Sequence, residues 1–156
     1  MLLLTKVQRE QLLENGRRQA AVKGTDNEID FRPVVKLFTP YGSATWLLTE
    51  IDPADETVAW GLCDLGMGVP EFGTVSLTDL SEYRGRFGLG IERDRHFTAR
   101  GPISAYIRAA DKSRTYRREH RYMTVNLWAV PQGAALSFSA SSRTNVVIHF
   151  FSRLRM

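Results

Sequence analysis

Cysteine is nearly absent from the chain, since Cys63 is the single one among 156 residues. That count excludes an internal disulfide and is usual for proteins of reducing compartments. Cys63 lies in the apolar run WGLC at positions 60–63, and no histidine stands near it in the sequence to serve as a base. We therefore interpret it as a small buried core residue without a nucleophilic role.

Long hydrophobic runs are missing as well. The opening MLLL gives way at Thr5-Lys6 to a polar stretch, whereas a secretory signal needs roughly 7–15 apolar residues and a membrane span ~20. We therefore expect a cytosolic protein with no membrane partner. An apolar content of 43% and a charged content of 24% over 156 residues are typical of one globular domain.

Acidic residues almost vanish from the C-terminal part. Residues 1–113 carry 14 Lys and Arg against 16 Asp and Glu, a net charge of −2, while residues 114–156 carry seven Arg and one Glu, a net charge of +6. Nucleic-acid contact is therefore expected only through the tail. Four of its arginines alternate with aromatic residues and could contact phosphates, although a solvated basic helix end explains them equally well: Arg114, Arg117, Arg118 and Arg121.

This change of composition divides the chain into a single domain at 1–113 and a basic appendage at 114–156. Residues 124–130, 134–138 and 146–151 of the appendage have strand-like sequences separated by turn residues. The appendage is either a genuine basic β segment, or a poorly ordered one in which the reading frame has departed from that of related proteins.

The first domain begins with a predicted helix over residues 5–22, which Thr5 can cap. Asn15-Gly16 is a favourable pair at which the first part of that helix could end. Residues 34–38, 44–51, 57–65 and 73–77 are predicted strands, and the short turns between the first three favour antiparallel pairing.

Two further helices and one strand complete the prediction. Residues 78–83 form a short helix capped by Ser76 or Thr78, residues 91–97 alternate like a strand, and Pro102 opens a helix over residues 102–112. The fold class is α+β: an antiparallel meander sheet of about four to five strands, with an N-terminal helix and a helix near residues 102–112.

Two groups of acids are candidates for chemistry. On a strand at 91–97, Glu92, Asp94 and His96 share one face and could bind a divalent ion, although they also suit the solvated face of an edge strand. Glu50, Asp64 and Glu71, with Asp52, lie at strand ends, where some of them could converge for acid–base catalysis. Asp52 and Asp64 are equally suited to hold loop amides.

Lys36, Trp46 and Trp60 suggest a binding surface, with Trp46 and Glu50 on one strand face and a Lys36–Glu50 pair across the strands. The alternative places both tryptophans in the core, with Lys36 extending past them. Neither glycine-rich segment, GMG at 66–68 nor GRFGLG at 85–90, has the pattern of a phosphate loop. We therefore expect no cofactor.

Several long blocks resemble one bacterial family: LLTKVQREQLLENGR at 3–17, EIDFRPVVKLFTP at 28–40, TWLLTEIDP at 45–53 and GLCDLGMGVPEFGTVSL at 61–77. Together with IERDRHFTA at 91–99, they are similar to the successive blocks of domain-of-unknown-function family 2958, over about residues 2–110. Membership implies a protein carried on bacterial plasmids and integrative conjugative elements, with a role around DNA transfer, maintenance or host defence. The resemblance brings no activity and no catalytic residue.

The leading hypothesis is a non-enzymatic adaptor domain that binds an unknown protein partner. The alternatives are a small metal- or carboxylate-dependent enzyme acting on nucleic acid or nucleotides, and a nucleic-acid binder that works through the tail. An enzyme should gather at least three candidate side chains in one concave pocket. An adaptor should present an apolar or aromatic patch, and tail-mediated binding should be strongly salt-dependent.

Overall fold

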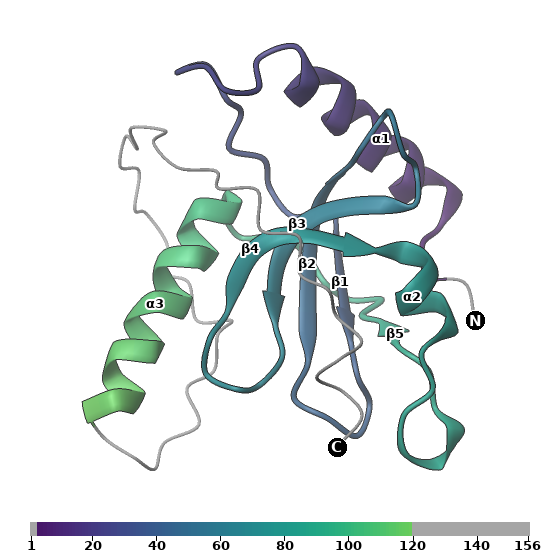
Figure 1. Cartoon of the computed structure of the whole chain (residues 1–156), viewed down its shortest axis with the longest axis vertical. Coiled ribbons are helices and arrows are strands. Elements are labelled where there is room, and N and C mark those ends of the chain that lie inside the picture. The colour runs from purple at the N-terminus through teal and green to yellow at the C-terminus, as the bar shows by residue number, and fades with distance from the viewer. Residues whose placement is uncertain (1–2, 120–156) are drawn as a thin grey trace.

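The computed structural model describes residues 3–119, with side chains up to residue 112. Helices and strands follow in this order: α1 (Lys6–Ala20), β1 (Val35–Phe38), β2 (Thr45–Ile51), β3 (Val58–Asp64), β4 (Glu71–Ser76), α2 (Leu77–Glu82), a short 3-10 turn (Arg86–Gly88), β5 (Glu92–Arg93) and α3 (Ile103–Glu119) (Figure 1). This arrangement confirms the predicted α+β class. The strands predicted at 124–130, 134–138 and 146–151 lie outside the described residues.

The five strands form one antiparallel sheet in the order β4-β3-β2-β1-β5. Hairpins join β1 to β2, β2 to β3 and β3 to β4, so the predicted meander is confirmed. The fifth strand returns to pair with β1, and it has two residues in place of the predicted seven. No helix in the described part of the chain is both long enough and apolar enough to span a membrane.

Helices cover both faces of the sheet (Figure 1). On the first face, Leu12 of α1 and Leu80 of α2 pack with Trp46 and Leu48 of β2. On the second face, apolar residues of α3 pack on residues of β2 and β3. This second layer comprises Leu47, Leu62, Ile103, Tyr106 and Ala110. Two separate apolar layers therefore hold the sheet between them, and burial of these side chains stabilises the fold.

The first helix begins with a capping box, in which Thr5 and Gln8 exchange side-chain and backbone hydrogen bonds. The predicted break at Asn15-Gly16 is wrong, because α1 continues to Ala20. These two residues serve contact with the sheet instead: Asn15 Nδ2 donates to the Thr49 carbonyl oxygen at 2.8 Å, and a Cβ at Gly16 would overlap the Ile51 carbonyl oxygen. Only glycine lets the helix approach β2 so closely.

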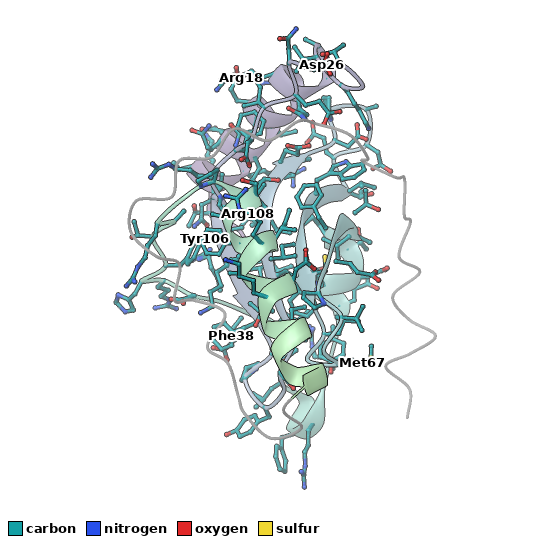
Figure 2. The ribbon with its side chains drawn as sticks, turned by 90° about the vertical axis from the view of Figure 1, so that its left-hand side faces the viewer. Arg18, Asp26, Phe38, Met67, Tyr106 and Arg108 are labelled. Carbon is teal, nitrogen blue, oxygen red and sulfur yellow. The ribbon has the colours of Figure 1, made fainter. Side chains whose placement is uncertain are left out.

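The last helix is longer than predicted and runs through residue 113 without a break. The segment before β1 fixes its start: the Phe31 carbonyl accepts from Ile103 N at 2.8 Å, and Asp30 Oδ1 accepts from Ser104 N at 3.1 Å. Figure 2 shows α3 along the sheet, with Arg18 and Asp26 at one end of the molecule and Met67 toward the other.

Gly16→Ala is expected to destabilise the protein, although alanine normally favours an exposed helix by about 1 kcal/mol over glycine. The added methyl group would displace α1 from β2, and overpacking of this kind costs about 1–3 kcal/mol. Urea unfolding measures the loss. Val7→Ala, at an exposed position of the same helix, is the control and should change the free energy of unfolding by no more than about 0.5 kcal/mol.

Candidate functional site

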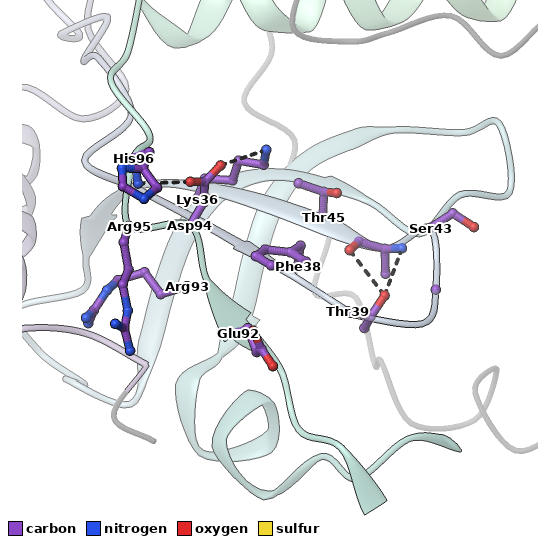
Figure 3. Close-up of a pocket in the computed structure, with 12 residues that line it drawn as sticks. Lys36, Phe38, Thr39, Ser43, Thr45, Glu92, Arg93, Asp94, Arg95 and His96 are labelled. Atoms are coloured by element: carbon purple, nitrogen blue, oxygen red, sulfur yellow. Dashed lines mark hydrogen bonds and ion pairs between the residues drawn. The ribbon is translucent and has the colours of Figure 1, made fainter. Parts of the chain in front are cut away.

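An open groove of about 580 Å³ lies beside the edge of the sheet formed by β1 and β5 (Figure 3). Lys36 and Phe38 of β1 lie along it, and the candidate residues Glu92, Asp94 and His96 also line it. Lys36 Nζ forms an ion pair with Asp94 Oδ2 at 3.0 Å, and His96 N donates to Asp94 Oδ1 at 3.0 Å. Asp94 N in turn donates to the Lys36 carbonyl oxygen at 2.9 Å.

These contacts determine the charge of Asp94. Its partial burial works against ionisation, but hydrogen bonds from Lys36 and from the His96 backbone, together with the charges of both residues, outweigh burial and lower the Asp94 pKa. The carboxylate therefore stays ionised and engaged with protein groups.

The groove does not have the geometry expected of a metal centre. The strand ends at Arg93, so the predicted alternation does not extend to Asp94 and His96. In Figure 3, Glu92 lies away from the Lys36–Asp94 pair. Among the residues that the structure describes, no three His, Cys, Asp or Glu side chains form a group that could hold a metal ion.

The candidate catalytic acids are divided between opposite ends of the sheet. Glu50 is buried near the end of β2 beside Trp60 of β3, whereas Asp64 and Glu71 flank the hairpin at the other end. Asp64 Oδ1 accepts from Gly66 N at 2.8 Å, and Asp52 Oδ1 accepts from Ala54 N at 2.9 Å. Both aspartates thus hold loop amides, as the alternative interpretation had it, and Glu50 does not meet Asp64 or Glu71.

The predicted binding surface of Lys36, Trp46 and Trp60 is not exposed. Trp46 and Trp60 are 1% and 7% exposed, because both faces of the sheet are covered. Lys36 lies opposite Leu47, and Glu50 lies opposite Trp60, so the expected Lys36–Glu50 pair is wrong. The β1–β2 pairing decides this, because it places Leu47, three residues before Glu50, opposite Lys36. Separately, a shift of register between Leu48 and Glu50 in the β2–β3 pairing breaks the alternation on which the shared face of Trp46 and Glu50 depended.

A cluster that sequence reasoning missed lies at the end of the sheet away from α1. Tyr41, in the turn between β1 and β2, is 69% exposed, and Phe87, in the turn after α2, is 73% exposed. Their rings meet edge to face with centroids 5.6 Å apart and planes at 75°. Three further exposed apolar residues lie at this end. Leu89 belongs to the turn of Phe87, and Met67 and Val69 belong to the hairpin turn between β3 and β4. We call these five residues the aromatic end.

The turns of the aromatic end are held in place by backbone contacts. Gly66 has a φ of +74° and lies so close to Ser43 that a Cβ at position 66 would overlap the Ser43 side chain. This close contact joins the β3–β4 turn to the β1–β2 turn. Gly85 N donates to the Leu89 carbonyl oxygen at 2.8 Å and closes the third turn. A small cavity of about 110 Å³ separates the β1–β2 turn from the third turn, and its walls include Pro40, Tyr41, Leu65, Tyr83, Arg86 and Leu89.

The backbone of Phe87 is unusual, because its φ is +63°. A bulky residue seldom adopts this left-handed conformation, which costs about 1–3 kcal/mol. The sequence signal for this feature is the run GRFGLG at 85–90, whose pattern predicts only a glycine-rich connection. Gly88 of this run has a φ of +71°, and no local pattern shows that Phe87 beside it shares the left-handed conformation.

A comparison with known families places the chain. The model of a protein family of unknown function, DUF2958, matches residues 3–116. The chain belongs to the DUF2958 family. Neither a curated protein nor a solved structure matches the chain. The family match confirms the resemblance carried by the sequence blocks and extends into α3.

Asp94→Asn is expected to lower the free energy of unfolding near pH 7 by about 0.2–1 kcal/mol, because it removes a partly exposed ion pair. The Asp94 pKa is lowered from 3.8 in the folded protein, so its stabilisation is present above the unfolded pKa and is lost as pH falls through the folded value. Urea midpoints of the wild type and variant should therefore converge in acid, once the pH has fallen through the lowered pKa of Asp94. A difference that persists there would point to packing instead of charge.

Cys63 is expected to be inert in the folded protein. It is 2% exposed, and burial, with a smaller effect of the Glu71 charge, raises its pKa to about 12. Since the thiolate is the reactive form, iodoacetamide at pH 8 should modify Cys63 only in denaturant, as mass spectrometry would show. Rapid modification of the native protein would contradict the buried placement.

Proposed function

We propose that this DUF2958 protein is a non-enzymatic protein-binding module and that the aromatic end is its contact surface. Following the family resemblance, the proposal includes a bacterial protein that acts in the cytoplasm and is carried on plasmids or other mobile elements. The observation that carries the proposal is the Tyr41–Phe87 pair: two large aromatic rings, far apart in the sequence, that contact each other edge to face while most of their surface faces solvent.

The energetics of Phe87 support a role in binding. A strained φ usually persists where surrounding structure or function requires it. Burial of the ring cannot offset the strain here, because the side chain is 73% exposed. Its contact with Tyr41 adds about 0.5–1.5 kcal/mol at most. A partner that covered the exposed part of the ring would gain the free energy of burying it.

The composition and position of the aromatic end also suit a protein interface. Aromatic residues, methionine and arginine are enriched at such interfaces, and a few aromatic anchors commonly supply most of the binding energy. The aromatic end contains Tyr41, Met67 and Phe87, and Arg86 lies over the Phe87 ring. Turns at the end of a packed sheet present these side chains on a rigid support.

The two alternatives have less support. Glu92, Asp94 and His96 line one groove, as an enzyme would require, but Asp94 is engaged by Lys36, and the acids Glu50, Asp64 and Glu71 lie elsewhere. Nucleic-acid binding through the tail has no structural support, because the arginines expected to carry it lie outside the described part of the chain: Arg121, and the side chains of Arg114, Arg117 and Arg118.

Phe87→Asn separates binding from stability. Asparagine tolerates a positive φ, so relief of strain should offset the lost ring contact and keep the free energy of unfolding within about 1 kcal/mol of wild type. Proteins captured from host lysate by the full-length chain should no longer bind the variant. The assay is quantitative mass spectrometry of captured proteins, with circular dichroism melting of each variant.

Val7→Asn is the matched control, because Val7 is 74% exposed but lies on α1, away from the aromatic end. It should retain the partners that Phe87→Asn loses. Partners that bind both variants as strongly as wild type would place the interface elsewhere and refute the proposal.

A further inference from the structure

We infer that the aromatic end binds an acidic peptide segment that inserts one apolar side chain beside a carboxylate. The inference rests on the proposed protein-binding function and names the chemistry of the partner. It comes from the charge of the turn that carries Phe87 and from the small cavity next to it.

Arg86 supplies the charge. Its guanidinium carbon lies 5.0 Å from the centroid of the Phe87 ring, within cation–π range. Among the residues that the structure describes, Arg86 forms no ion pair, whereas Arg9, Arg17 and Lys36 each have an acidic partner. Arg86 is exposed, and the ring beneath it limits the directions that the guanidinium can take. A positioned arginine with free donors is suited to bind a carboxylate through two hydrogen bonds.

Arg84 adds a second positive charge to the same turn. Its Nη1 donates to the carbonyl oxygens of Ser81 at 2.8 Å and Tyr83 at 2.7 Å, which fixes it at the end of α2. Glu82 is the closest acid along the chain, but it forms no ion pair with either arginine in the described part of the protein. Residues 83–90 thus carry two positive charges and no acid beside an apolar surface, which favours a partner of opposite charge.

The cavity supplies the apolar subsite. Its volume of about 110 Å³ is somewhat below that of the cavity of about 150 Å³ that accommodates benzene. It therefore suits one branched aliphatic side chain. Pro40, Leu65 and Leu89 give it apolar walls, and Tyr41 and Tyr83 add ring surface.

The two subsites adjoin, because Arg86 both lines the cavity and stacks on Phe87. A peptide with an aliphatic side chain in the cavity would bring a carboxylate to Arg86 only from a nearby residue of the same segment. The geometry thus selects peptides in which Asp or Glu stands within a few positions of Leu, Ile or Val.

The test uses a phage-displayed library of random 12-residue peptides, panned on the full-length protein after depletion on Phe87→Asn. Enriched peptides are expected to combine Asp or Glu with an aliphatic residue. One such peptide, resynthesised with fluorescein, is then titrated by fluorescence polarisation against wild type, Arg86→Lys, Arg86→Glu and Phe87→Asn. Melting curves confirm that each variant is folded.

Arg86→Glu should weaken binding of this peptide about tenfold at low salt, because it replaces an attraction with a repulsion, and the difference should shrink in about 0.5 M salt. Arg86→Lys should bind with an affinity between those of wild type and Arg86→Glu, since it keeps the charge but loses the paired hydrogen bonds and the stacked guanidinium. Phe87→Asn should abolish measurable binding. This pattern supports the inference.

Other outcomes overturn it. Peptides that depend on Phe87 but lack acids, or that bind Arg86→Glu as well as wild type, would refute the acidic partner and leave the protein-binding proposal intact. A panning that yields no Phe87-dependent peptide would count against both. Sedimentation velocity covers a further case: self-association that Phe87→Asn removes would identify a second copy of this chain as the occupant and replace the inferred peptide.

Discussion

The close contact between α1 and β2 governs how the sheet presents its side chains. Gly16 lets the helix backbone approach the Ile51 carbonyl, and Asn15 binds the Thr49 carbonyl oxygen. At this place β2 changes register against β3, between Leu48 and Glu50. The irregularity returns Ile51 to the core under α1 and leaves Glu50 beside Trp60. One local departure from regular pairing therefore determines which polar group is buried on the second face.

The two ends of the sheet differ in packing and exposure. At the end near α1, close backbone contacts and buried side chains hold the layers together. At the other end, the turns contain exposed rings, left-handed backbone and an arginine without an ion-pair partner among the described residues. The acids Glu50, Asp64 and Glu71 are divided between the two ends. The exposed apolar side chains of this second end are the basis of the protein-binding role proposed above.

Much of the fold was predictable because its signals are local. Thr5 caps α1, Ser76 caps α2, and short turns join the first four strands, all as their sequences indicate. The predictions of candidate sites were wrong where they depended on strand register and strand length, which non-local contacts determine. The β1–β2 register overturned the expected Lys36–Glu50 pair. The register shift between β2 and β3 removed the shared face of Trp46 and Glu50, and β5 ended at Arg93, short of the alternation predicted to continue through His96. The Tyr41–Phe87 pair joins residues from separate turns, which no sequence window contains.

The anchoring of the turns at Gly66 and Gly85 has a consequence for how this domain can be altered. Tyr41, Met67 and Phe87 do not belong to the apolar layers that α1 and α3 pack against the sheet. These three residues can therefore be substituted without repacking the interior. In the binding role proposed above, the contact surface can therefore change by substitution while the packed layers stay the same.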